Sequence, residues 1–185
     1  SLVCLFSIYF VYVSVYVFRI SRDIDKFYKG DLFEMEEVSQ LLAHDMGEAY
    51  KKDMPPLDLN IRISEYSETG IRYGYRYDGK ILRLFIPLRV ISFSSDQKRA
   101  YFAHEIGHYI LDHCSLSGQP RIFCEVEEGD LKQEIEADSF ALKFSKGDSL
   151  REVIEILVWN TEEKEIRLDA LNENLNLIKN ELEDS

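Results

Sequence analysis

The sequence predicts an α+β fold in which a small antiparallel sheet packs with several amphipathic helices. Two observations support this fold class. Three short runs typical of strands lie together between residues 59 and 86, and segments with the helical spacing of apolar residues flank them on both sides. The chain has 185 residues, of which 45% are hydrophobic, so it is large enough to bury a core without cross-links.

An uncharged run forms the first 18 residues, and Arg19 follows at the length at which a helix just crosses the hydrocarbon core of a bilayer. We predict a transmembrane anchor at residues 1–18, through which the protein contacts a membrane, and a juxtamembrane linker at 19–33. Basic residues after the run place the following domain in the cytoplasm by the positive-inside rule. The alternatives are a pair of buried strands, because valine, tyrosine and phenylalanine dominate the run, and a soluble cytoplasmic protein.

A first amphipathic helix is predicted over residues 34–51, where apolar side chains recur at helical spacing until Pro55 and Pro56 end the pattern. Three strands are then expected, at residues 59–64, 71–77 and 80–86. The last two are joined by Asp78-Gly79, a dipeptide favoured in two-residue hairpin turns. We therefore expect a small antiparallel sheet.

Further helices follow the strands. Ser94, Ser95 and Asp96 offer capping groups for a helix that carries the chemical motif of the chain. Another helix is expected over residues 131–145, and the apolar run at 150–159 is either a buried helix or a strand. The last segment is expected to be a helix that docks on the domain through residues at heptad spacing, namely Leu168, Leu171, Leu175, Ile178 and Leu182.

The motif H-E-x-x-H lies on the predicted helix as His104-Glu105-Ile106-Gly107-His108. Its four-residue spacing places both imidazoles on one face, as a tetrahedral Zn²⁺ ion requires of two nitrogen ligands. Glu105 lies beside that face, where it can take a proton from a metal-bound water that attacks a carbonyl. Gly107 inside a helix costs about 1 kcal/mol relative to alanine, which indicates close packing or a ligand requirement there. The motif predicts amide hydrolysis with a Zn²⁺ cofactor and Glu105 as the catalytic base.

A catalytic zinc site needs a third protein ligand and one open position. Glu134 and Asp138 lie four residues apart on a predicted helix, on the side that carries the apolar residues, whereas Glu136 faces away. We predict Glu134 as the third ligand, with Glu136 as the alternative, and Asp138 as the carboxylate that accepts a hydrogen bond from a ligand imidazole. A solvated acidic face is the competing interpretation, although an unpaired carboxylate on an apolar side is costly.

The stretch AHEIGHYILDH at residues 103–113, followed by EIEADSFA at 134–141, resembles the ImmA/IrrE family of zinc metallopeptidases within the gluzincin group. The resemblance implies a zincin-like fold and a zinc-dependent metalloendopeptidase with Glu105 as general base. It implies a regulatory protein substrate, such as a repressor. The zinc ligands that it implies are His104, His108 and Glu134.

The resemblance also suggests how the chain is organised. We assign the metallopeptidase domain to residues 34–148 and a helical C-terminal segment to 149–185. By analogy with related peptidases, the strand at 80–86 is expected to line the cleft and to pair with an extended substrate. Membrane-bound gluzincins of the CAAX-protease and HtpX type share the E-x-x-A-D signature and are the nearest relatives to consider.

Charge and cysteine content limit other functions. The chain has 34 acidic and 22 basic residues and a net charge of −12, which argues against direct binding of nucleic acid. Three cysteines are too few for a disulfide framework and favour a reducing compartment, with a Cys114–Cys124 bridge as the alternative. We expect a protein or peptide substrate as partner. The rival function is a non-catalytic zinc-stabilised binding or sensor module, in which Cys114 or Cys124 closes the site as a fourth ligand.

Other side chains near the motif are expected to be structural. We interpret His113 as a histidine at the end of a helix, where the helix dipole favours it, and not as a metal ligand. His44 is interpreted as a solvated or packing residue. Tyr101 and Tyr109 flank the motif and are expected to pack against the core with their hydroxyl groups bonded.

Overall fold

The computed structural model describes residues 29–62, 70–76, 79–113 and 131–183. Helices and strands are mixed and helix predominates, which confirms the predicted α+β class at that level. In chain order the elements are α2 (Lys29–Tyr50), β1 (Leu57–Arg62), β2 (Gly70–Arg76), β3 (Gly79–Pro87), the 3-10 helix η1 (Leu88–Ser92), α3 (Ser95–Ile110), α4 (Leu131–Ala141), α5 (Gly147–Leu157) and α6 (Thr161–Glu183).

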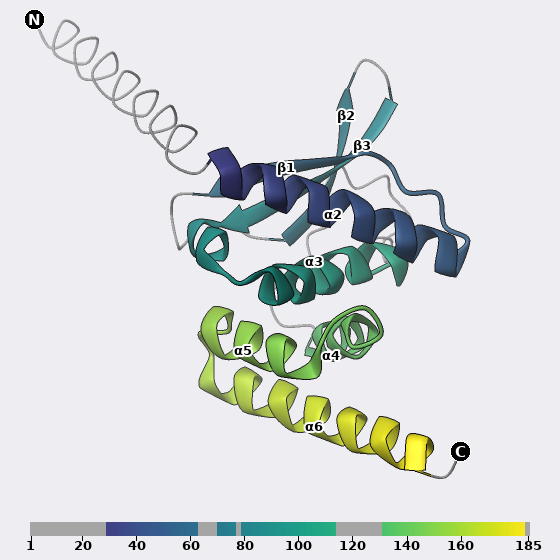
Figure 1. Cartoon of the computed structure of the whole chain (residues 1–185), viewed down its shortest axis with the longest axis vertical. Helices are drawn as coiled ribbons and strands as arrows, with labels where there is room; N and C mark the ends of the chain where they lie inside the picture. Colours follow the sequence, from purple (N-terminus) through teal and green to yellow (C-terminus); the bar gives the residue numbers. More distant parts are fainter. Residues whose placement is uncertain (1–28, 63–69, 77–78, 114–130, 184–185) are drawn as a thin grey trace, which may run out of the picture.

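These elements stack along the long axis of the molecule (Figure 1). The sheet and α2 lie at one end, α3 crosses beside them, α4 and α5 follow, and α6 forms the other end. One hydrophobic cluster runs through the stack and joins Met35 of α2, Phe102 of α3, Phe140 of α4, Leu150 of α5 and Leu171 of α6. The helix that carries the H-E-x-x-H motif is therefore the central element of the fold.

The N-terminal predictions fall largely outside the described residues. The anchor expected at residues 1–18 lies there, and so does most of the linker expected at 19–33. Where the chain is described, none of its helices combines the length and the apolar composition needed to cross a bilayer. Helix α2 begins at Lys29, inside the expected linker, and carries Asp31 in its first turn, where the helix dipole favours a negative charge.

The sheet has the order β1-β3-β2 and is mixed rather than wholly antiparallel. Strands β2 and β3 pair antiparallel, as the hairpin prediction requires, but β1 pairs parallel with β3 from Leu57 opposite Leu82 to Arg62 opposite Pro87. The prediction of an antiparallel sheet is therefore wrong for β1. The physical reason lies in burial: β3 is the most apolar strand and takes the centre, whereas β1 alternates apolar and polar residues and suits an edge.

The central place of β3 also corrects the expected substrate strand. Both edges of β3 are already hydrogen-bonded, to β1 on one side and to β2 on the other. The strand predicted at residues 80–86 is therefore not open to pairing with a peptide. Within the described part of the chain, the outer strands of this sheet are β1 and β2.

Both ends of α3 are capped. The Ser94 hydroxyl accepts a hydrogen bond from the Gln97 backbone N–H at 3.3 Å, and the Gln97 side-chain oxygen accepts one from the Ser94 N–H at 2.8 Å. This capping box confirms the predicted start of the helix. At the other end Lys52 Nζ donates to the carbonyl oxygens of Tyr109 and Ile110, 2.8 and 3.1 Å away, where the helix dipole favours a positive charge.

Helices α3 and α4 approach closely at Gly107. A Cβ atom at this glycine would lie 3.1 Å from the Phe140 ring of α4, a contact tighter than side chains normally make. The close packing that the sequence indicates at Gly107 is thus confirmed. Because the helices are close here, side chains on their facing sides can share one small space.

The C-terminal part is helical throughout most of its described length. Helix α4 ends at Ala141, earlier than expected, and turns follow it. The apolar run at 150–159 lies mostly in the helix α5 and is not a strand. The predicted docking of the terminal helix is confirmed for its first part, since Leu171 of α6 is buried and Leu168 and Leu175 pack against the core, whereas Ile178 is exposed and the side chain of Leu182 lies outside the described part. Helix α6 thereby lies against α4, the helix that carries the acidic candidates.

Candidate metal centre

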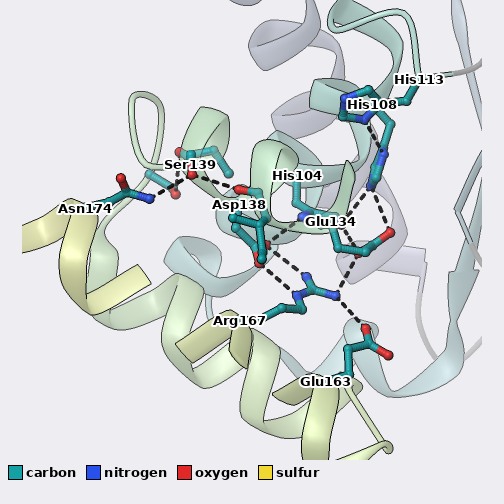
Figure 2. Close-up of polar contacts among 12 residues, drawn as sticks. His104, His108, His113, Glu134, Asp138, Ser139, Glu163, Arg167 and Asn174 are labelled. Carbon is teal, nitrogen blue, oxygen red and sulfur yellow. Dashed lines mark hydrogen bonds and ion pairs between the residues drawn. The ribbon is translucent and has the colours of Figure 1, made fainter. Parts of the chain in front are cut away.

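Two pairs of side chains spaced four residues apart face each other across the α3–α4 contact (Figure 2). His104 and His108 come from α3, and Glu134 and Asp138 come from α4. His104, His108 and Glu134 form a group whose ligand atoms converge and could hold a metal ion. In the part of the chain that is described, this is the one such group.

The distances within this group suit a tetrahedral ion. His104 Nε2 lies 3.1 Å from His108 Nε2 and 3.2 Å from Glu134 Oε2, and His108 Nε2 lies 3.4 Å from Glu134 Oε1. Ligand atoms about 2.0–2.1 Å from a zinc ion at tetrahedral angles lie about 3.3 Å from one another. The three donors therefore already have the mutual spacing that a shared cation imposes.

The chemistry of the donors points the same way. The Asp138 carboxylate only accepts hydrogen bonds, so the His104 Nδ1–H must donate to Asp138 Oδ1, 2.8 Å away, and a neutral His104 carries its lone pair on Nε2. That lone pair faces a second imidazole nitrogen and a carboxylate in a buried space. Such a cluster of electron pairs is unfavourable unless a proton or a metal cation lies between them.

The pKa values show where a proton lies when no metal is bound. Although burial lowers it, the pKa of His104 is raised to about 10 by the negative charges of Asp138 and Glu134 and by its hydrogen bonds to them. Burial and the nearby charge of His104 lower the pKa of His108 to about 3. Burial alone would raise the pKa of Glu134, but hydrogen bonding to His104 and the surrounding positive charges hold it far below its usual value. At neutral pH the metal-free centre therefore has a cationic His104, with the additional proton on Nε2, and a neutral His108.

Arg167 on α6 completes the environment of the acidic pair, and sequence reasoning missed it. Its Nε and Nη2 donate to the two Asp138 oxygens at 2.8 and 2.9 Å, and its Nη1 donates to Glu134 Oε2 at 2.7 Å and to Glu163 Oε1 at 3.3 Å. The guanidinium is buried and neutralises two carboxylates that would otherwise repel each other. One signal was available, because Arg167 lies four residues before Leu171, on the helix face that packs inward.

Glu105 lies in a buried setting next to the ligand group. Its side chain is 8% exposed, and burial raises the pKa of Glu105 to about 7, against the opposing effect of the nearby charge of His104. The Tyr101 hydroxyl donates to the Phe85 carbonyl oxygen at 3.4 Å, and its interaction with the Glu105 carboxylate works to lower the pKa of Glu105, so Tyr101 lies beside the site as well as in the core. A carboxylate with a pKa near neutrality is a stronger base than an ordinary one and is still largely ionised at slightly alkaline pH.

His113 differs from its interpretation as a simple histidine at a helix end. It is buried, and its Nδ1 lies 2.9 Å from His108 Nδ1, while its Nε2 lies 3.1 Å from Glu136 Oε2. Glu136, the alternative third ligand, is outside the converging group and contacts His113 instead. The sequence interpretation assumed that α3 simply ends, and it did not allow for the chain folding back on His108.

The remaining candidates lie away from the converging ligand atoms or outside the described residues. His44 is exposed on α2, with 75% of its side-chain surface accessible, in agreement with a solvated role. The Tyr109 hydroxyl donates to the Asp53 carbonyl oxygen at 2.9 Å, as expected of a packing tyrosine with a bonded hydroxyl. Cys114 and Cys124, the candidate fourth ligands of a closed site, lie outside the described residues.

Comparisons of the chain with protein-family models, with curated proteins and with solved structures gave no match. Its function is therefore inferred from the residues of the centre and from their geometry.

Proposed function

We propose that this protein is a zinc-dependent metallopeptidase that hydrolyses peptide bonds of a protein substrate. The observation that carries the proposal is the convergence of His104, His108 and Glu134 beside the buried carboxylate of Glu105. Two histidines and one glutamate are a donor set typical of catalytic zinc. When bound, zinc would polarise the substrate carbonyl and make a bound water acidic.

The protein's own residues supply binding, orientation and proton transfer. His104, His108 and Glu134 would hold the ion, and Asp138 keeps the His104 ring oriented with Nε2 toward it. Glu105 would accept the proton of the attacking water and deliver it to the leaving amine nitrogen.

The sheet offers an edge for an extended peptide. Among the described strands β2 is an outer one, and it contacts α3, the helix of the H-E-x-x-H motif. A peptide in extended conformation can add to such an edge through main-chain hydrogen bonds, whatever its side chains. We propose that the substrate lies along β2, and that it is a regulatory protein of the kind that the resemblance to the ImmA/IrrE family implies.

The proposal is tested by metal content and cleavage together. Elemental analysis of the purified full chain should give one zinc per chain, which is lost in Glu134→Ala and retained in Glu136→Ala. Cleavage is then followed by mass spectrometry of new peptide termini in casein, with zinc-loaded wild type beside Glu105→Gln.

We expect new termini with the wild type and none with Glu105→Gln, although this variant still binds zinc. A folded wild type without bound metal would overturn the metal centre. The non-catalytic module would be favoured by a different pair of results: the wild type binds one zinc but cleaves nothing, and Cys114→Ser or Cys124→Ser loses that zinc.

A further inference from the structure

We propose that His113 and Glu136 are positioning residues for His108, which they hold through a hydrogen-bonded chain so that His108 Nε2 faces the metal. This inference rests on the proposed metal centre. The chain runs from Glu136 on α4, through His113 just after α3, to His108 on α3 (Figure 2 shows the His113–His108 part).

The direction of each hydrogen bond follows from the acceptor at its outer end. The Glu136 carboxylate only accepts, so the His113 Nε2–H donates to Glu136 Oε2 across 3.1 Å. A neutral His113 then has a bare Nδ1, which accepts from the His108 Nδ1–H at 2.9 Å. His108 is left with its lone pair on Nε2, the atom that lies 3.4 Å from Glu134 Oε1. The chain thus selects the tautomer that a metal ligand needs.

The backbone at the end of α3 explains why His113 is available. Asp112 has a φ of 59°, in the left-handed region that aspartate tolerates better than most residues. Its N–H bonds to the Tyr109 carbonyl oxygen at 3.2 Å, and the His113 N–H bonds to the His108 carbonyl oxygen at 3.1 Å. This is the Schellman pattern of helix termination, in which the side chains of the residues joined by the longer bond often touch. Here those residues are His113 and His108.

The same geometry separates His113 from the ligands themselves. It approaches His108 from Nδ1, on the opposite side of the ring from the Nε2 that faces His104 and Glu134. His113 therefore supports a ligand from outside and leaves the fourth position of the ion to other groups. Glu136 is 46% exposed on its side chain, so it anchors the outer end of the chain near solvent.

The test measures zinc affinity of the full chain by competition with a chromophoric chelator, together with the visible absorption of bound Co²⁺. His113→Leu removes the acceptor for His108, whereas His113→Gln keeps an amide oxygen that can accept the same bond. Glu136→Ala removes only the outer end. His44→Leu is the matched control, because it removes an exposed histidine far along the chain from the motif.

We expect His113→Leu to weaken zinc binding by about 10- to 100-fold and to shift the Co²⁺ absorption, since loss of an outer partner has effects of that size. His113→Gln should recover most of the affinity, Glu136→Ala should show a smaller loss, and the control should match the wild type. A purely structural role would not predict rescue by Gln or a shift in the Co²⁺ spectrum.

Wild-type affinity and spectrum in a folded His113→Leu variant would overturn this inference while leaving the metal centre intact. Should that variant not fold, Glu136→Ala decides, and an unchanged affinity and spectrum there would overturn it equally. A folded wild type that binds no zinc would overturn the metal centre itself, and with it this inference.

Discussion

The two histidines of the centre are supported in contrasting ways. His104 donates to Asp138, a buried carboxylate that Arg167 also binds through two hydrogen bonds. His108 instead contacts His113, which donates its other hydrogen bond to the half-exposed Glu136. One support is charged and desolvated, and the other is an imidazole with its charged partner at the protein surface. Buried charges are costly to leave unpaired, so we expect the His104 side to tolerate change far less than the His108 side.

The largest effect is expected for Arg167→Met, which leaves the carboxylates of Asp138 and Glu134 buried without their common partner. Breaking a buried ion pair in this way costs about 3–5 kcal/mol, whereas an unpaired neutral donor in His113→Leu costs about 1–3 kcal/mol. Urea unfolding of the metal-free proteins measures both. The contrast between the two supports would be wrong if Arg167→Met were no less stable than His113→Leu.

A second comparison uses metal affinity. Asp138→Asn keeps an oxygen that can accept from His104 but removes the negative charge that Arg167 and His104 share. We expect zinc affinity to fall toward the upper end of the range of about 10- to 100-fold, and further than in Glu136→Ala. Chelator competition on Asp138→Asn and Glu136→Ala side by side measures both losses of zinc affinity. Equal losses would mean that the supports of His104 and His108 do not differ in strength.

A third prediction uses the opposite pKa shifts of the two ligands. The pKa of His104 is raised to about 10 and that of His108 is lowered to about 3, so at pH 6 only His104 carries a proton that zinc must displace. Zinc binding at pH 6 should release at least the one proton of His104, with a further contribution from Glu105, whose pKa is about 7, and affinity should rise at least about tenfold per pH unit while His104 remains protonated. Calorimetry in buffers of different ionisation enthalpy counts the protons, and a count of zero at pH 6 would contradict the assignment.

The smallest effect is expected for Lys52, which pairs with Asp112 at the end of α3. Lys52→Met removes the cation that caps the C-terminal carbonyls of α3 but touches none of the ligands. Loss of such a cap should lower the free energy of unfolding by about 0.3–1 kcal/mol and leave zinc affinity unchanged. A clear loss of affinity would mean that the end of α3, and with it His113, moves when the cap is removed.

Much of the centre was predictable because it depends on helical spacing. The separation of four residues puts His104 beside His108, and the same separation puts Glu134 beside Asp138, whatever the rest of the fold does. Close packing of Gly107 against Phe140 then brings the two pairs together. The role of His113 was not predicted because the position of His113 depends on the left-handed backbone of Asp112. This residue turns the chain back toward His108, whereas a continuing helix would have moved His113 away from it.

Strand order was less predictable than strand existence. The hairpin of β2 and β3 follows from a short connection, but nothing local specifies which of them lies beside β1. Burial decided it, because the apolar β3 is covered on both edges and β1 runs parallel to it.

The sequence alone determined most of the helices, the three strands, and which side chains within one helix share a face, since these are properties of a few consecutive residues. Only the tertiary structure decided that Arg167, twenty-nine residues after Asp138, binds that carboxylate, and that β3 lies at the centre of the sheet. Such contacts depend on how apolar faces pack over the whole chain. The spacing of residues within one helix does not predict which residues of another helix, beyond a loop, they will meet. The convergence of His104, His108 and Glu134 could therefore be predicted from sequence, whereas the contacts that Arg167 and His113 make with this group required the fold.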